Sequence, residues 1–210
     1  MFIEHKHIMS TARKISQAKY IEQEDLEQFA NKKVIPEILR KEILTALSYY
    51  PMLKDTTITF AFKESFRKHF MQAQPVISTM FRRREEREYI ILMNKYFEIE
   101  DERIFIDSMP VDVLVGWIGH ELGHIVDYTH RGFFSLIKFG IGYLISKSFI
   151  IGAERVADTY AIHQGLAGHL IQTKNYILNH THLPDRFKSK IRRLYMPPEE
   201  VMMLVEKAHK

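Results

Sequence analysis

The chain contains the pattern H-E-x-x-H within the stretch Trp117-Ile118-Gly119-His120-Glu121-Leu122-Gly123-His124-Ile125-Val126-Asp127. In a helix of about 3.6 residues per turn, His120 and His124 lie one turn apart on the same face. Both imidazoles can therefore bind one metal ion, while Glu121 projects from a neighbouring angle and can hold a water beside it. This is the arrangement of zinc metalloproteases, in which two histidines bind the metal and the glutamate is the general base.

The helix that carries this pattern is expected to begin at Ser108 or Met109 and to end near Gly132, which suits a left-handed stop. Apolar residues cover most of its circumference, so it is expected to be buried. Three glycines fall near one side of it, which predicts that a strand or another helix approaches closely there. These glycines are Gly116, Gly119 and Gly123.

A catalytic zinc site needs a third protein ligand and an open position. His130 is one candidate, because H-E-x-x-H followed by this histidine has the metzincin spacing H-E-x-x-H-x-x-G-x-x-H. Asp127 stands where that signature has its turning glycine, so the sharp bend toward the metal is less available. His130 is therefore the less favoured candidate.

The favoured third ligand is Glu154, within Gly-Ala-Glu-Arg-Val-Ala-Asp-Thr-Tyr-Ala at residues 152–161. This stretch predicts a second helix that ends near Gly165, and Glu154 and Asp158 share one of its faces. Glu154 would complete the coordination, and Asp158 would accept a hydrogen bond from the far nitrogen of a ligand histidine. The alternative is that Glu154 binds no metal and is a surface glutamate beside an Asp/Arg pair.

The two motifs together, H-E-L-G-H and then A-E-R-V-A-D, resemble the gluzincins, specifically the CAAX prenyl-protease and HtpX-like family of membrane-associated zinc peptidases. The resemblance covers about residues 110–195 and implies that Glu154 is the third ligand. It also implies that His182, in Thr-His-Leu-Pro at residues 181–184, faces the cleft as a transition-state donor, although a leucine here interrupts the family's T-H-P segment. The family's following arginine has three candidate counterparts: Arg186, Lys190 and Arg192.

The region before the metal motif favours strands at residues 56–62, 76–81, 89–94 and 104–106, with a charged turn at 82–88. Residues 89–94 are a candidate edge strand that would pair with an extended substrate, and the favoured alternative is an ordinary strand of the sheet. The predicted fold is a single α+β, zincin-like domain over residues 1–210, with a small mixed or antiparallel sheet packed on the H-E-x-x-H helix. Its parts are an N-terminal helical part (1–50, with a helix after Pro36), the sheet (51–107), the metal-site helices (108–170) and a C-terminal helical part (171–210).

The amino-acid composition limits the chemistry that the chain can use. The 210 residues include no cysteine, so any metal must be held by histidines and carboxylates. The net charge of +4 and a pI near 9.1 are mild, and no basic motif interleaved with aromatic residues accompanies them, so nucleic-acid binding is not expected. The N-terminus shows no secretory signal, which favours a cytoplasmic protein.

The stretch Phe133–Ile151 is nineteen residues long and strongly apolar, which raises the question of a membrane span. A single crossing would put His124 and Glu154 on opposite sides of about 30 Å of hydrocarbon, so one span is excluded if both bind one metal. The remaining alternatives are a helix or hairpin hinged near Gly140 and Gly142 that is buried or covered by a partner, and a segment in peripheral contact with a membrane surface.

These observations predict a zinc-dependent endopeptidase that acts on a peptide or protein substrate. Glu121 would take a proton from the attacking water, and His182, Tyr160 or His163 would donate to the oxyanion. The alternative is a non-catalytic, zinc-stabilised scaffold or membrane-surface interaction protein. A third alternative is that the motif binds no metal.

Overall fold

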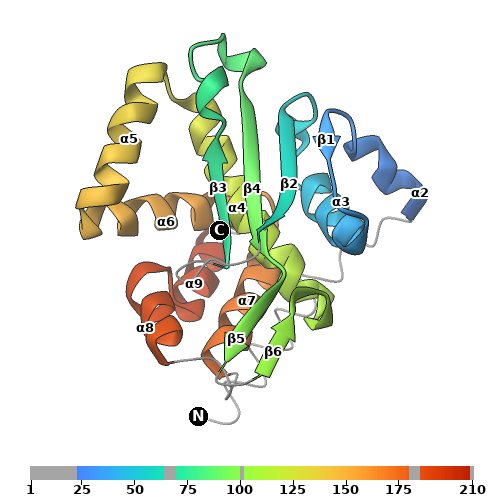
Figure 1. The fold of residues 1–210 in the computed structure, drawn as a ribbon. Helices are drawn as coiled ribbons and strands as arrows, with labels where there is room; N and C mark the ends of the chain where they lie inside the picture. The colour runs from blue at the N-terminus through green and yellow to red at the C-terminus, as the bar shows by residue number, and fades with distance from the viewer. Residues whose placement is uncertain (1–22, 64–69, 100–101, 180–184, 209–210) are drawn as a thin grey trace.

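The structure is a computed structural model that describes residues 23–63, 70–99, 102–179 and 185–208 (Figure 1). It is a mixed α+β fold with one four-stranded sheet, a separate two-stranded sheet and a group of helices packed around one central helix. The expected fold class is therefore confirmed at the level of a small mixed sheet packed with helices.

The main sheet contains β1 (Lys33–Val34), β2 (Thr57–Lys63), β3 (Met71–Pro75) and β4 (Glu88–Asn94), in the order β1-β2-β4-β3. The pairs β1–β2 and β2–β4 are parallel, and β3 runs antiparallel to β4. Alternate side chains of β2 and β4 are buried, as a sheet with one face on the core requires. They are Ile58, Phe60, Tyr89, Ile91 and Met93.

One prediction about this sheet is wrong, and of the two interpretations of residues 89–94 the ordinary strand is confirmed. Residues 76–81 do not form a strand, because the chain leaves the sheet after Pro75 and forms the short 3-10 helix η5 (Ile77–Thr79). The strand at residues 89–94 is real but lies inside the sheet, between β2 and β3. The edge on this side of the sheet is therefore β3, and the charged turn that follows it contains η6 (Arg84–Glu86).

The N-terminal part contains α2 (Gln23–Leu26), η2 (Glu27–Phe29), η3 (Glu37–Leu39), α3 (Arg40–Ser48) and η4 (Pro51–Leu53). The helix predicted after Pro36 is confirmed, whereas the short strand β1 before it was not predicted. After β4 comes a hairpin of β5 (Tyr96–Ile99) and β6 (Glu102–Phe105), and then η7 (Ile106–Ser108).

The central helix is α4 (Val111–His130), which contacts β3, α3, α6 and α7. Every residue from Val113 to Tyr128 is buried, as the apolar circumference predicted. A Cβ added to Gly116 would lie 2.4 Å from the backbone oxygen of His169, and one added to Gly123 would lie 2.5 Å from that of Ala157. The close helix approach predicted from these glycines is confirmed.

The C-terminal half is helical, with α5 (Phe133–Ile145), α6 (Lys147–His163), α7 (Ala167–Asn179), α8 (Asp185–Leu194) and α9 (Pro198–Ala208). Gly132 has an ordinary negative φ and begins α5, so the predicted left-handed stop is wrong there. The chain bends by 120° between α5 and α6, at Ser146 and not at Gly140 or Gly142. Within the described ranges no single helix is both long and apolar enough to cross a membrane.

Candidate metal centre

Three side chains from two helices meet in the interior of the protein. His120 and His124 come from α4, Glu154 comes from α6, and each is at most 5% exposed. One ligand atom from each lies within 4.8 Å of the others. The i, i+4 spacing on α4 puts both imidazoles on one face, and the close approach at Gly123 brings α6 within reach of them.

The distances suit a small tetrahedral ion. The Glu154 Oε2 atom lies 3.0 Å from His120 Nε2 and 3.5 Å from His124 Nε2. Two atoms bound tetrahedrally to zinc at about 2.0–2.1 Å lie roughly 3.3 Å apart. Two imidazoles and one carboxylate are also a donor set that catalytic zinc sites use. These residues therefore could hold a metal ion of this kind.

Asp158 supports one of the two histidines from behind. Its Oδ1 atom lies 2.9 Å from Nδ1 of His120, the nitrogen that faces away from Glu154. Its other oxygen accepts hydrogen bonds from Lys174 Nζ at 2.8 Å and from the backbone N–H of Met196 at 3.1 Å. Asp158 thus fixes the orientation of the His120 ring, and Lys174 and Met196 fix Asp158 in turn.

His130, the alternative third ligand, lies away from this cluster. α4 continues as a helix through Asp127, whose carboxylate forms a bidentate ion pair with Arg131 at 2.8 and 3.0 Å. His130 is exposed, and its Nδ1 atom lies 2.8 Å from the carbonyl oxygen of Val126, within the same helix. The turn that would bring this histidine back to the metal does not form.

Glu121 lies between the metal cluster and the sheet edge. It is 4% exposed, and its Oε2 atom accepts a hydrogen bond of 2.7 Å from the backbone N–H of Ala73 in β3. Tyr128, two turns further along α4, donates to the carbonyl oxygen of the same alanine at 3.3 Å. α4 is therefore attached directly to the edge strand, and Glu121 is held beside it.

A cavity of about 440 Å³ opens beside these residues. Glu121, His124 and Glu154 form its polar end, and its walls come from β3, η5, α4 and α5. Much of the remaining lining is apolar, and includes Met71, Met80, Leu136, Phe139 and Leu144. A volume of this size is typical of a site that encloses part of a ligand.

Three tyrosines line this cavity: Tyr128, described above, and two others that no sequence motif marked. Tyr143 of α5 donates a hydrogen bond of 2.7 Å to Oε1 of Glu154. The ring of Tyr195, which follows α8, lies with its centroid 5.2 Å from that of His120. Both lie near the metal cluster, so both can act on a ligand bound in the cavity.

Two of the three residues predicted as oxyanion donors lie away from the cavity. Tyr160 packs on the ring of His130 with centroids 6.3 Å apart, and His163 is exposed at the end of α6. Neither belongs to the described residues that line the cavity. His182 lies outside the described residues, as do the side chains of Arg186 and Lys190, and Arg192 is exposed on α8.

The cluster changes the acidities of its members. Burial raises the pKa of Glu121, and the negative charge of Glu154 adds to this effect. Burial alone would lower the pKa of His120, but hydrogen bonds to the Asp158 and Glu154 carboxylates outweigh it and raise the pKa to about 10. Burial opposes ionisation of Glu154 as well, yet His124 and His120 hold its pKa well below the usual range.

Comparison with known proteins adds no identification, since no family model, no curated protein and no solved structure matches this chain. The assignment of a function therefore depends on the residues and the geometry described above.

Proposed function

We propose that this protein is a zinc-dependent endopeptidase of the gluzincin type, with His120, His124 and Glu154 as the metal ligands. The observation that carries the proposal is the convergence of these three buried side chains beside a cavity that Glu121 also lines. Accidental H-E-x-x-H matches have no reason to place an acidic residue of another helix within 3.5 Å of both histidines. The resemblance to the CAAX prenyl-protease and HtpX-like family agrees with this ligand set.

A zinc ion bound there would polarise the substrate carbonyl and lower the pKa of a water toward 7. Glu121 accepts a proton from the attacking water as the water oxygen bonds to the carbonyl carbon. It then returns this proton to the amine nitrogen as the C–N bond breaks. Burial raises the pKa of Glu121, which brings the carboxylate closer to the acidity that both transfers require.

Tyr143 is the donor that this geometry favours for the oxyanion. Its hydroxyl lies 2.7 Å from Glu154 and lines the cavity, so a small rotation can direct the O–H toward a carbonyl bound beside the cluster. A positioned donor at the developing charge is worth about 10²–10³ in rate. Tyr195 is the second candidate for this role, because it lines the same cavity.

The substrate would lie in an extended conformation along β3. This strand is the edge of the sheet, and all of Met71–Pro75 lines the cavity. Glu121 and Tyr128 already bind the N–H and carbonyl oxygen of Ala73, so a substrate strand would pair with β3 on either side of Ala73. Such main-chain hydrogen bonds bind peptides without regard to sequence. The apolar walls would then select an apolar side chain next to the cleaved bond.

The decisive experiment measures metal content and peptide hydrolysis on the same preparations. Wild-type protein is expected to retain one zinc per chain and to cleave a quenched peptide library with apolar residues. Glu121→Gln should retain the zinc, and its kcat should be about 10²–10⁴-fold lower. Glu154→Ala should lose the metal itself. Glu86→Gln, which changes an exposed carboxylate on η6, is the control and should keep both properties.

The same measurements separate the proposal from its rivals. Zinc bound with no hydrolysis of any peptide by wild type would favour the zinc-stabilised scaffold, in which the ion only links α4 to α6. Preparations with no metal after zinc loading would contradict both readings. Activity that survives in Glu121→Gln would remove this residue from the mechanism.

A further inference from the structure

Helix α5 exposes an apolar stripe along its whole length. Phe134 is 83% exposed and Leu144 is 84% exposed, although both are large apolar side chains. The full stripe recurs at helical spacing and consists of Phe134, Ile137, Ile141, Leu144 and Ile145. Only Leu136 and Phe139 of this helix are buried. Burial within this chain is therefore wrong for most of α5, whereas cover by a partner and contact with a membrane surface stay predictions.

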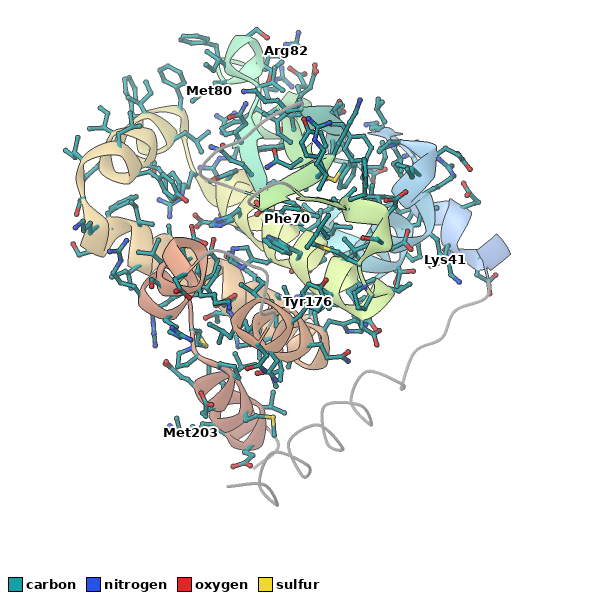
Figure 2. All side chains as sticks on the ribbon, turned by 60° about the horizontal axis from the view of Figure 1, so that its bottom comes forward. Lys41, Phe70, Met80, Arg82, Tyr176 and Met203 are labelled. Atoms are coloured by element: carbon teal, nitrogen blue, oxygen red, sulfur yellow. The ribbon has the colours of Figure 1, made fainter. Side chains whose placement is uncertain are left out.

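The tip that joins β3 to β4 continues this stripe. Ile77 and Phe81 are each 77% exposed, and the ring of Phe81 lies 4.4 Å from that of Phe133 at the start of α5. Figure 2 shows Met80 and Arg82 on this tip, beside the N-terminal end of α5. Half of the large exposed apolar side chains in the described part of the chain belong to the tip and α5. Their clustering on one edge of the molecule is what an interaction surface shows.

The surroundings of the stripe are basic. Residues 133–153 contain two lysines and no aspartate or glutamate. Lys138 is exposed on α5, and Lys147 is exposed where α6 begins. The tip carries charges of both signs, and its Arg82 is paired with Glu88 at 2.8 Å. The two lysines therefore set the charge next to the apolar stripe.

We propose that the α5 stripe, with Ile77 and Phe81, docks this protein on an anionic lipid surface without crossing it. Apolar side chains would enter the boundary between headgroups and acyl chains, and Lys138 and Lys147 would contact the lipid phosphates. A second copy of the chain fits this face less well. In a symmetric dimer that packs α5 on α5, the two lysines would meet no carboxylate, because α5 and the α5–α6 junction have none and the carboxylates of this edge lie among the arginines of the tip.

The α5 stripe together with Ile77 and Phe81, called the docking face from here on, has residues in common with the lining of the cavity. Ile77, Ile137 and Leu144 are exposed members of the docking face, and each also lines the cavity that contains Glu121. Docking would therefore place the mouth of the cavity at the lipid surface. If the proposed peptidase activity holds, on which this step rests, the substrates are protein segments that lie at or emerge from that surface.

The test is flotation with vesicles of phosphatidylcholine, with and without phosphatidylglycerol, in the presence of excess chelator and of zinc. Wild type should bind the anionic vesicles in both conditions, because docking does not use the metal. Phe134→Ser with Leu144→Ser should lower partitioning on the order of a hundredfold. Val34→Ser with Met203→Ser changes two exposed residues on other elements and should bind as wild type does. Lys138→Gln with Lys147→Gln should lower partitioning roughly thirtyfold, on anionic vesicles alone.

Thermal unfolding of each variant checks that the fold is kept, which is expected because the changed residues are exposed. The proposal is overturned if wild type binds neither kind of vesicle. Equal binding of the Phe134/Leu144 variant and wild type would overturn it too. A wild-type dimer that dissociates in this variant, with no lipid binding, would assign the face to a second copy instead. Because the chelated protein is tested as well, these outcomes do not depend on the peptidase proposal.

Discussion

Replacing Lys174 with methionine is expected to weaken both the fold and metal binding. Lys174 is 4% exposed and Asp158 is fully buried, and their Nζ and Oδ2 atoms are 2.8 Å apart. Methionine fills a similar volume but removes the cation from Oδ2 of Asp158, which then keeps only the Met196 N–H, while Oδ1 keeps its contact with His120. Breaking a buried ion pair by removing one partner costs about 3–5 kcal/mol in the free energy of unfolding.

The effect on the metal follows from the contact between Asp158 and His120. A carboxylate that has lost one of its hydrogen-bond donors holds the ring less firmly, and loss of such support costs about 10–100-fold in metal affinity. Two measurements give these quantities: urea unfolding with excess chelator, and competition for zinc against a chromophoric chelator. Lys41→Met is the control, because Lys41 is exposed on α3 (Figure 2).

The double variant Lys174→Met with Asp158→Asn tests the physical cause. If the loss comes from an unpaired buried charge, removing the second charge should restore part of the free energy of unfolding. The reasoning is refuted if Lys174→Met unfolds within about 0.5 kcal/mol of Lys41→Met and binds zinc as tightly as wild type.

Three further predictions test helix packing, catalysis and metal binding. Gly123→Ala should cost about 1–3 kcal/mol in urea unfolding because its Cβ would meet the α6 backbone, whereas Gly152→Ala, with open space around it, should stabilise α6 by about 0.5–1 kcal/mol. Tyr143→Phe should lower kcat about 10²–10³-fold, and Tyr160→Phe, outside the cavity, should leave kcat unchanged in the same peptide assay. Because the pKa of His120 without metal is raised to about 10, zinc binding near pH 8 should release about one proton, and affinity should fall about tenfold for each unit of acidification. Calorimetry in buffers of different ionisation enthalpy would show no difference if this is wrong.

The position of the metal cluster could be predicted because it depends on local geometry. Helical spacing alone puts His120 beside His124 and Glu154 beside Asp158. The glycines of α4 indicated that another helix comes close, and the structure shows α6 touching Gly123. The patterns H-E-L-G-H and A-E-R-V-A-D thus predicted which faces of α4 and α6 meet.

The edge strand could not be predicted in the same way. Residues 71–75 read Met-Gln-Ala-Gln-Pro, which lacks β-branched residues and ends in proline. They form a strand because β4 pairs with one side of them, while Glu121 and Tyr128 bind Ala73 from the other. These contacts come from residues far away in the sequence, so the local sequence of residues 71–75 does not predict a strand.

The supporting residues were missed for a related reason. Tyr143 and Lys174 belong to no motif, and their roles depend on how α5 and α7 pack on α6. Lys174 did leave one signal, because it shares the apolar face of α7 with Leu170 and Ile177 at helical spacing. A lysine on such a face needs a buried partner, and Asp158 is that partner.

The buried charges give an independent argument for a divalent cation at this centre. Glu121, Glu154 and Asp158 carry three negative charges when ionised, and Lys174 carries one positive charge. A divalent ion between neutral histidines makes the whole set neutral, which is the condition under which charges can be buried at low cost. For the residues alone, the pKa values of Glu121 and His120 are both raised, so both groups tend to take up protons. These protons would supply the positive charge that a bound zinc ion provides, which is why metal and protons should compete for the same site.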